Sequence, residues 1–130
     1  MDSKKVVAAV TYNPSLQKFL LMKRADERTL FPGYWEFPSG FIKENELIED
    51  AALRELKEET SLKGEIIRIG ESFRIDQPEA KICPVLIKVN EKNVDLSREH
   101  SKFEWVNLED IKELSTVPKL DKDLENIGVN

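Results

Sequence analysis

The chain has 130 residues, of which 40% are hydrophobic and 35% are charged. These values predict a single folded domain with one core over residues 1–130, and they exclude an intrinsically disordered chain. The net charge is -5 and no run of basic residues occurs, so we expect no nucleic acid as a partner. No apolar run reaches the ~18 residues of a membrane span, and we expect no membrane partner.

Cys83 is the only cysteine, so an internal disulfide is excluded and a reducing, cytoplasmic location is expected. It stands in an apolar run with Ile82, Val85 and Leu86. That setting predicts a buried structural thiol and not a nucleophile.

The first third of the chain is rich in strand patterns. Strands are predicted at residues 5–12, 18–24 and 35–37. The turn residues at 13–15 predict a hairpin between the first two strands. Residues 25–34 are predicted to form a loop, and residues 38–40 a second break in regular structure.

One long helix is predicted over residues 46–60, with Asn45 as its N-cap. Three more strands are predicted at 65–74, 81–89 and 102–106, followed by short helices at 108–114 and 120–127. Gly70 indicates a bend in the first of these strands, the turn at 76–79 follows it, and Pro84 favours an edge or a bulge in the next strand. Strands on both sides of one helix, joined mostly as hairpins, predict an α+β fold with a mixed sheet and helices against its faces.

Acidic residues on the predicted helix come together in space. At roughly 100° per residue, Glu55, Glu58 and Glu59 fall within an arc of about 100° on a helical wheel. The small apolar residues Ala51 and Ala52 share this arc. An acidic face that only meets solvent would lie away from apolar residues, so the pattern favours a functional site.

Carboxylates at neighbouring helix positions repel each other, more strongly when they are partly buried. A divalent cation would offset this repulsion, and oxygen-only ligands select hard ions such as Mg²⁺ or Mn²⁺. A structural acidic helix without metal is the alternative. Arg54 can reach Glu58 one turn later, either as a surface pair worth under ~1 kcal/mol or as a group that orients a ligand carboxylate.

The stretch from Gly40 to Leu62 resembles the Nudix box. That motif reads glycine, five residues, glutamate, seven residues, arginine-glutamate, an aliphatic residue, any residue, glutamate-glutamate, any residue, glycine and an aliphatic residue. The chain matches it in register at Gly40, Glu46, Arg54, Glu55, Leu56, Glu58, Glu59 and Leu62. Similarity to MutT-type members extends to Arg24-Ala25, to Glu36-Phe37-Pro38 and to Phe103-Glu104-Trp105-Val106.

The resemblance implies a Nudix fold, in which a mixed sheet lies between helices and the box forms a loop, a helix and a loop. It also implies Mg²⁺-dependent hydrolysis of a nucleoside diphosphate linked to another group, such as a nucleoside triphosphate, ADP-ribose, a nucleotide sugar or a dinucleoside polyphosphate. The implied partner is this small molecule, and a second copy of the chain is a further candidate partner.

Roles for individual residues follow from the same resemblance. The implied metal ligands are Gly40, through a backbone carbonyl, and Glu55, Glu58, Glu59 and Glu99. Arg54 and Glu46 would orient these ligands. Glu55 is the first candidate for the base that takes a proton from the attacking water, and Glu99 is the second. The implied substrate-binding residues are Arg24, Glu36 and Phe37.

The chain departs from the family pattern at Ser61, where the box has its late glycine. If this position needs a left-handed backbone, serine costs about 1 kcal/mol; otherwise the helix continues and Gly64 ends it. Residues 117–120 contain no asparagine, whereas MutT-type members place one there for oxidised guanine, so that substrate is disfavoured. Among the aromatic residues, Trp35, Phe73 and Phe103 could stack on a base or lie in the core. His100 is expected to be an ordinary loop residue, and contact with the substrate is the alternative.

Other functions remain as alternatives. A non-catalytic Nudix-like domain that binds or senses a nucleotide would be expected to lose box glutamates, and this chain retains them. An isomerase of prenyl diphosphates on the same fold would need a catalytic cysteine, which the strand position of Cys83 disfavours.

Overall fold

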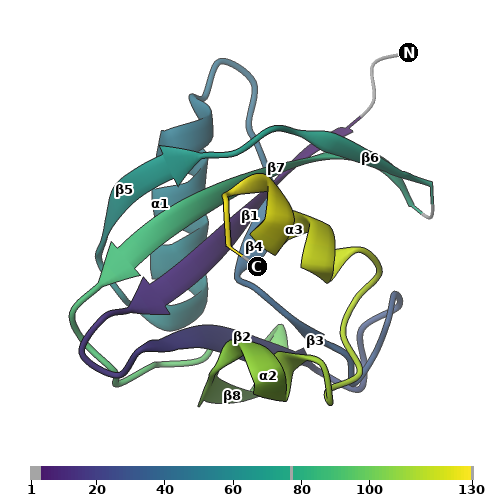
Figure 1. Ribbon diagram of the computed structural model, residues 1–130. Coiled ribbons are helices and arrows are strands. Elements are labelled where there is room, and N and C mark those ends of the chain that lie inside the picture. The colour runs from purple at the N-terminus through teal and green to yellow at the C-terminus, as the bar shows by residue number, and fades with distance from the viewer. Residues whose placement is uncertain (1–3, 77, 130) are drawn as a thin grey trace.

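The computed structural model describes residues 4–76 and 78–129, which form one sheet with helices on both faces (Figure 1). Its strands are β1 (Lys4–Asn13), β2 (Lys18–Arg24), β3 (Trp35–Glu36), β4 (Ser39–Phe41), β5 (Gly64–Ile69), β6 (Phe73–Asp76), β7 (Glu79–Val89) and β8 (His100–Val106). Its helices are α1 (Ile48–Thr60), α2 (Leu108–Ile111) and α3 (Leu120–Asn126). None of the helices in the described ranges is long and apolar enough to cross a membrane.

Strand β1 is the centre of the sheet. It pairs in parallel with β7 on one side and antiparallel with β2 and β4 on the other. The main path of the sheet runs β3-β2-β1-β7-β5, with β4, β6 and β8 paired beside it. One parallel pair within an otherwise antiparallel sheet confirms the predicted α+β class with a mixed sheet.

In the predicted hairpin, β1 and β2 pair only next to the turn that joins them, where Tyr12 pairs with Phe19. The strands then diverge, and β4 takes the place of β2 beside the N-terminal half of β1. The amide of Ala9 donates to the carbonyl of Pro38 at 2.7 Å where the exchange occurs. The predicted break at residues 38–40 is therefore wrong for Ser39 and Gly40, because both pair with β1.

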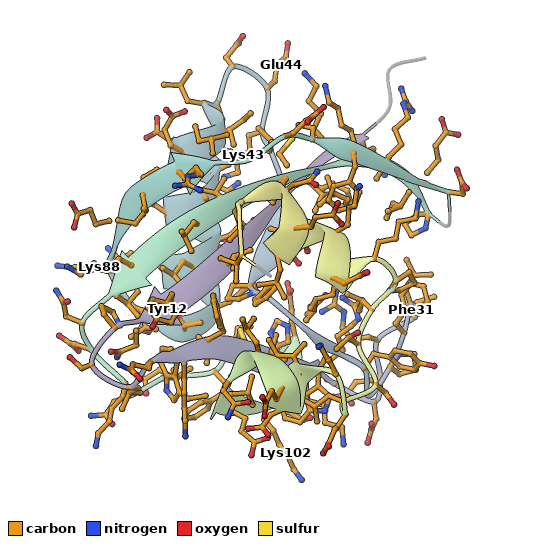
Figure 2. The ribbon with its side chains drawn as sticks, in the orientation of Figure 1. Tyr12, Phe31, Lys43, Glu44, Lys88 and Lys102 are labelled. Carbon is orange, nitrogen blue, oxygen red and sulfur yellow. The ribbon has the colours of Figure 1, made fainter. Side chains whose placement is uncertain are left out.

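Two apolar cores lie on opposite faces of the sheet. Alternate residues of β2 face opposite ways, so that Leu20 belongs to the core under α1 and Leu21 to the core under α2 and α3. Figure 1 shows α1 behind the sheet and α3 in front of it. Charged side chains such as Lys43, Glu44 and Lys102 point outward from the molecule (Figure 2). Cys83 is buried, as predicted.

Two strand predictions need correction near Pro84. The predicted strand 65–74 is divided into β5 and β6, and Gly70 lies between them, where a Cβ atom would come within 2.6 Å of the Asn126 carbonyl oxygen. Pro84 does not mark an edge strand, because β7 pairs with β1 on one side and with β5 and β6 on the other. Its position is tolerated because Pro84 lies opposite the interruption between β5 and β6, where its carbonyl accepts from the Gly70 amide. Part of the predicted turn at 76–79 lies outside the described residues.

Helix α1 begins two residues later than predicted. Asn45 is not its N-cap, because the backbone there has a φ of 64° and the N-cap position is Leu47, which makes no side-chain capping bond. The helix ends at Ser61, whose φ of 66° is left-handed. Gly64 instead begins β5. Of the two predicted alternatives, the structure thus confirms the one in which Ser61 ends the helix with a left-handed backbone.

We predict that Ser61→Gly raises the free energy of unfolding by up to about 1 kcal/mol, because glycine adopts this left-handed conformation without steric cost. Urea denaturation of the purified variants measures the change. Ser61→Ala is the matched control, since it keeps the Cβ atom at an exposed position and should stay within ~0.5 kcal/mol of the wild type. Equal stability of the glycine and alanine variants would contradict backbone strain at this site.

Candidate active site

The three box glutamates of α1 lie at different depths. Glu59 is buried, Glu55 is half-buried, and the side chain of Glu58 is 54% exposed. The helical wheel predicted that the three glutamates share one side of the helix. In the structure, that side of α1 extends from the apolar core to the solvent. The carboxylates therefore differ in solvation although they are neighbours on the helix.

Glu55 lies directly against the backbone of Gly40. A Cβ atom at residue 40 would come within 2.2 Å of the Glu55 carboxyl carbon, which is closer than real Cβ atoms approach. The φ at Gly40 is ordinary, so this glycine is required by the close approach of the carboxyl group and not by backbone conformation. The first glycine of the box and its central glutamate, Glu55, thus meet at one point in space.

Glu59 lies beneath them in the core. Its Oε1 accepts a hydrogen bond from the Ser39 amide at 3.3 Å, whereas its Oε2 is buried and has no hydrogen-bond partner among the described residues. Burial raises the pKa of the Glu59 carboxyl well above its ordinary value, and the neighbouring Glu55 carboxyl adds to the effect. An uncompensated buried carboxylate is unfavourable, so this position favours either a proton or a cation beside it.

Arg54 holds the loop before α1 against the helix. Its Nε and Nη2 donate to the two oxygens of Glu46 at 2.8 and 2.9 Å, and Nη1 donates to Glu55 at 2.8 Å. The hydrogen bond from Arg54, together with the one from the Lys43 amide, lowers the pKa of Glu46 to about 2. The bond to Glu46 also raises the pKa of Arg54. Arg54 reaches Glu58 as well, at 3.3 Å, as the spacing predicted.

A buried chain of charges runs beside the helix. Arg24 donates to Glu36 at 2.9 Å, and the other oxygen of Glu36 contacts His100 Nε2 at 2.8 Å. His100 Nδ1 lies 3.9 Å from Glu59, and the His100 side chain is fully buried. The expectation of a loop position is therefore wrong, because His100 begins β8 and its side chain points inward. A sequence pattern does not reveal this, since the side-chain partners of His100, Glu36 and Glu59, lie far away along the chain.

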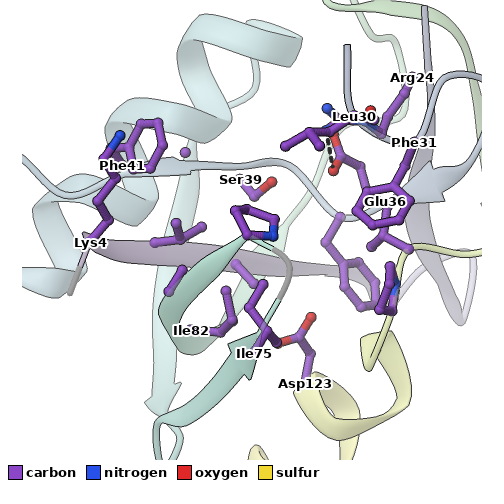
Figure 3. Close-up of a pocket in the computed structure, with 18 of the residues that line it drawn as sticks. Lys4, Arg24, Leu30, Phe31, Glu36, Ser39, Phe41, Ile75, Ile82 and Asp123 are labelled. Atoms are coloured by element: carbon purple, nitrogen blue, oxygen red, sulfur yellow. Dashed lines mark hydrogen bonds and ion pairs between the residues drawn. The ribbon is translucent and has the colours of Figure 1, made fainter. Parts of the chain in front are cut away.

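A cavity of about 470 Å³ opens beside Arg24 and Glu36 (Figure 3). Its lining includes the predicted site residues Arg24, Glu36, Phe37, Gly40, Glu55 and Glu99. The predicted metal ligands Glu58 and Glu59 and the predicted orienting residue Arg54 are not part of the lining. Phe37 lines the cavity but is 1% exposed and belongs to the apolar core.

Glu99 faces this cavity from the loop that precedes β8. Its side chain is 55% exposed and pairs with Arg28 at 3.4 Å. Arg28 also lines the cavity, although the sequence did not single it out. Both residues are therefore available to a ligand, whereas Arg24 is already held by Glu36 and by the Leu30 carbonyl.

The residues present fit a hard divalent cation by their chemistry. In residues 4–76 and 78–129, no three acidic, histidine or cysteine side chains are close enough to form a preassembled metal site. The donors around Gly40 are nevertheless carboxylate and backbone oxygens, which Mg²⁺ and Mn²⁺ prefer. The unpartnered Glu59 Oε2 beside Glu55 is the kind of buried atom that a cation would satisfy.

Asp123 also lines the cavity, and Figure 3 shows it beside Ile75. The apolar residues Phe73, Val117 and Pro118 are further members of the lining. Asp123 is 6% exposed, and its Oδ1 has no hydrogen-bond partner among the described residues. Burial raises the pKa of the Asp123 carboxyl to about 8, and the charge of Asp121 adds to the effect. The sequence did not indicate this residue, because an aspartate in a polar helix is ordinarily exposed.

We predict a pH dependence of stability from Asp123. The unfolded chain loses this proton near the ordinary pKa of 3.8, and the folded protein keeps it until about pH 8. The folded state binds more protons between these values, so the free energy of unfolding should fall with rising pH by about 1.4 kcal/mol per pH unit from this group. Asp123→Asn cannot ionise and should gain stability relative to the wild type from pH 5 to pH 8.

Urea denaturation at several pH values measures the difference between the two proteins. Asp121→Asn serves as the control, because this exposed aspartate should change the slope far less. Parallel stability curves for the wild type and Asp123→Asn would contradict a buried, protonated carboxyl group.

Known proteins resemble this chain in sequence and in structure. The chain is 31% identical over 109 residues to the nucleoside triphosphatase NudI of Klebsiella pneumoniae, with 72% of this chain and 76% of that protein covered. A shorter match of 49% identity over 41 residues to NudI of Escherichia fergusonii spans 32% of this chain and only 29% of the relative. A crystal structure of a C. elegans Ap4A hydrolase binary complex has a TM-score of 0.76 and 27% identity, with 92% of both chains covered.

The family model of the NUDIX domain matches residues 2–126, which is nearly the whole chain. The match includes the glutamates of α1, the glycine under Glu55 and the strands that hold them. This protein therefore belongs to the Nudix family.

Proposed function

We propose that the protein hydrolyses the diphosphate linkage of a nucleoside diphosphate joined to another group, with Mg²⁺ or Mn²⁺ as cofactor. The observation that carries this proposal is one cavity lined by Gly40, Glu55 and Glu99 and also by apolar side chains such as Phe73 and Ile75. With a cation bound, charged phosphates fit beside the carboxylates, and a planar base fits against the apolar side chains. The names of the relatives support a nucleoside triphosphate or a dinucleoside polyphosphate as the first substrates to test.

The residues that would hold the cation are Glu55, Glu59, Glu99 and the Gly40 carbonyl. Glu58 would join them by exchanging its contact with Arg54 for the ion. A bound divalent cation would neutralise phosphate oxygens and lower the pKa of a water molecule. Glu55 would take the proton of the attacking water, with Glu99 as the second candidate, because both face the cavity.

Arginines would have separate roles in this reaction. Arg54 would position Glu55 through its hydrogen bond at 2.8 Å. Arg28 would contact a phosphate group, because its side chain is 30% exposed and its pair with Glu99 is long, at 3.4 Å. Arg24 would hold Glu36 in place from within the core and would not meet the phosphates itself.

A panel of nucleoside triphosphates, dinucleoside polyphosphates, ADP-ribose and nucleotide sugars with Mg²⁺ tests this function. We expect turnover of at least one class, and a fall in kcat of about 100-fold or more for Glu55→Gln, since general-base catalysis contributes about 10²–10⁴. Gly40→Ala should also lower kcat, because its Cβ atom would displace the Glu55 carboxyl group. Melting temperatures of all variants establish that they fold.

The matched control is Glu49→Gln, which makes the same change in the first turn of the same helix, away from the cavity. Its kcat should stay within about twofold of the wild type. Binding of a nucleotide without turnover of any substrate would favour the alternative of a non-catalytic binding or sensor domain. Wild-type activity in Glu55→Gln would refute the assignment of Glu55 as the base.

A further inference from the structure

A second cavity, of about 470 Å³, lies beside the first halves of β1 and β7 and has a basic lining. The loop before α1 borders it, together with Ser72 and Cys83. Neither Glu55 nor Glu99 belongs to this lining, and among the described residues only Lys4 lines both cavities. The cationic side chains around the second cavity are those of Lys4, Lys5, Lys43 and Lys81.

Two of these lysines are neighbours on adjacent strands. Lys5 of β1 pairs in register with Lys81 of β7, and both alternate along their strands with residues of the core under α1. Their side chains therefore leave the sheet on the same face. Arg74 of β6, which also pairs with Glu79 at 3.6 Å, is the register partner of Lys81 and adds a third cation to the row. Like charges on adjacent strands repel each other, so this row is unfavourable in the free protein.

The charges of Lys5 and Lys81 are not balanced by the surrounding protein. Among residues 4–76 and 78–129, neither side chain takes part in a salt bridge or a hydrogen bond. Two acidic residues also line the cavity, but both oxygens of Glu46 already accept hydrogen bonds from Arg54. Figure 2 shows the other one, Glu44, at the outer end of the loop. The cavity therefore presents a positive charge to a ligand.

The groups around the cavity fit a multivalent oxyanion. Lysine ammonium groups bind phosphate as point charges, and ammonium groups on different elements can share one anion that carries several charges. Ser72 donates its hydroxyl to the Cys83 sulfur at 3.3 Å. Because sulfur is a weak acceptor, this hydroxyl can turn to a phosphate oxygen instead. The volume of the cavity leaves room for more than one phosphate group.

We propose that the second cavity binds a multivalent phosphate anion, such as pyrophosphate or a short polyphosphate, between Lys5, Lys81 and Lys43. Lys43 belongs to the loop before α1, and its amide donates to Glu46 at 2.9 Å. Glu46 in turn accepts from Arg54. An anion shared between this loop and two strands braces the loop that holds Arg54. The site does not depend on the proposed hydrolase function.

Calorimetric titration with phosphate, pyrophosphate and tripolyphosphate in the presence of EDTA tests this site without requiring turnover. EDTA removes divalent cations, so the carboxylates of the first cavity repel the anion. We expect the affinity of the wild type to rise with the charge of the anion. The double variant Lys5→Gln, Lys81→Gln should bind tripolyphosphate about tenfold more weakly, because two charge contacts are lost. Tripolyphosphate should also raise the melting temperature of the wild type more than that of this variant.

The matched control is the double variant Lys18→Gln, Lys102→Gln, which removes the same charge from exposed strand positions outside both linings. Arg28→Gln is the second control, because it removes a cation from the first cavity. Both should keep the wild-type affinity within about twofold. The inference is overturned if the wild type binds no tripolyphosphate, if the Lys5 and Lys81 variant keeps its affinity, or if either control loses as much.

Melting temperatures without the anion verify that all variants fold. The Lys5 and Lys81 variant should be at least as stable as the wild type at low salt, because its substitutions remove the repulsion within the row. Anion binding in a protein that hydrolyses no nucleotide would refute the hydrolase function alone, so the two proposals fail separately.

Discussion

The guanidinium of Arg54 joins the loop after β4 to the helix that carries the carboxylates. It binds both oxygens of Glu46, donates to the Phe41 carbonyl and donates to Glu55. A planar fork of donors can hold these acceptors at the same time, whereas a lysine ammonium cannot match that geometry. With the loop fixed in this way, the Glu55 carboxyl group lies against Gly40, where no Cβ atom would fit.

The divergence of β1 and β2 provides the place for this arrangement. The two strands pair only near Tyr12 and Phe19, and β4 fills the gap that opens beyond. The short strand β4 thus joins the sheet and leads directly into the loop before α1. Glu36 and Ser39, which flank this entry, are brought within hydrogen-bond distance of His100 and Glu59 respectively. The interruption of a simple hairpin is what assembles the site.

Unsatisfied polar atoms occur at both ends of the cavity region, on Glu59 and on Asp123. Each costs free energy in the free protein because a buried acceptor without a donor has lost its hydration. Both carboxyl groups have a raised pKa for the same reason, which is burial. A cation beside Glu59 would supply the missing partner there and would stabilise the folded protein.

The sequence by itself determined the α+β class, most strands, the central helix and the register of the box from Gly40 to Leu62, because these depend on local periodicity and fixed spacing. It did not determine how deep each glutamate lies, where β1 and β2 separate, or that Pro84 is tolerated in a central strand. These features depend on contacts between residues far apart in the chain. The burial of His100 and Asp123 was decided by the tertiary structure alone, since nothing in the local sequence distinguishes them from exposed polar residues.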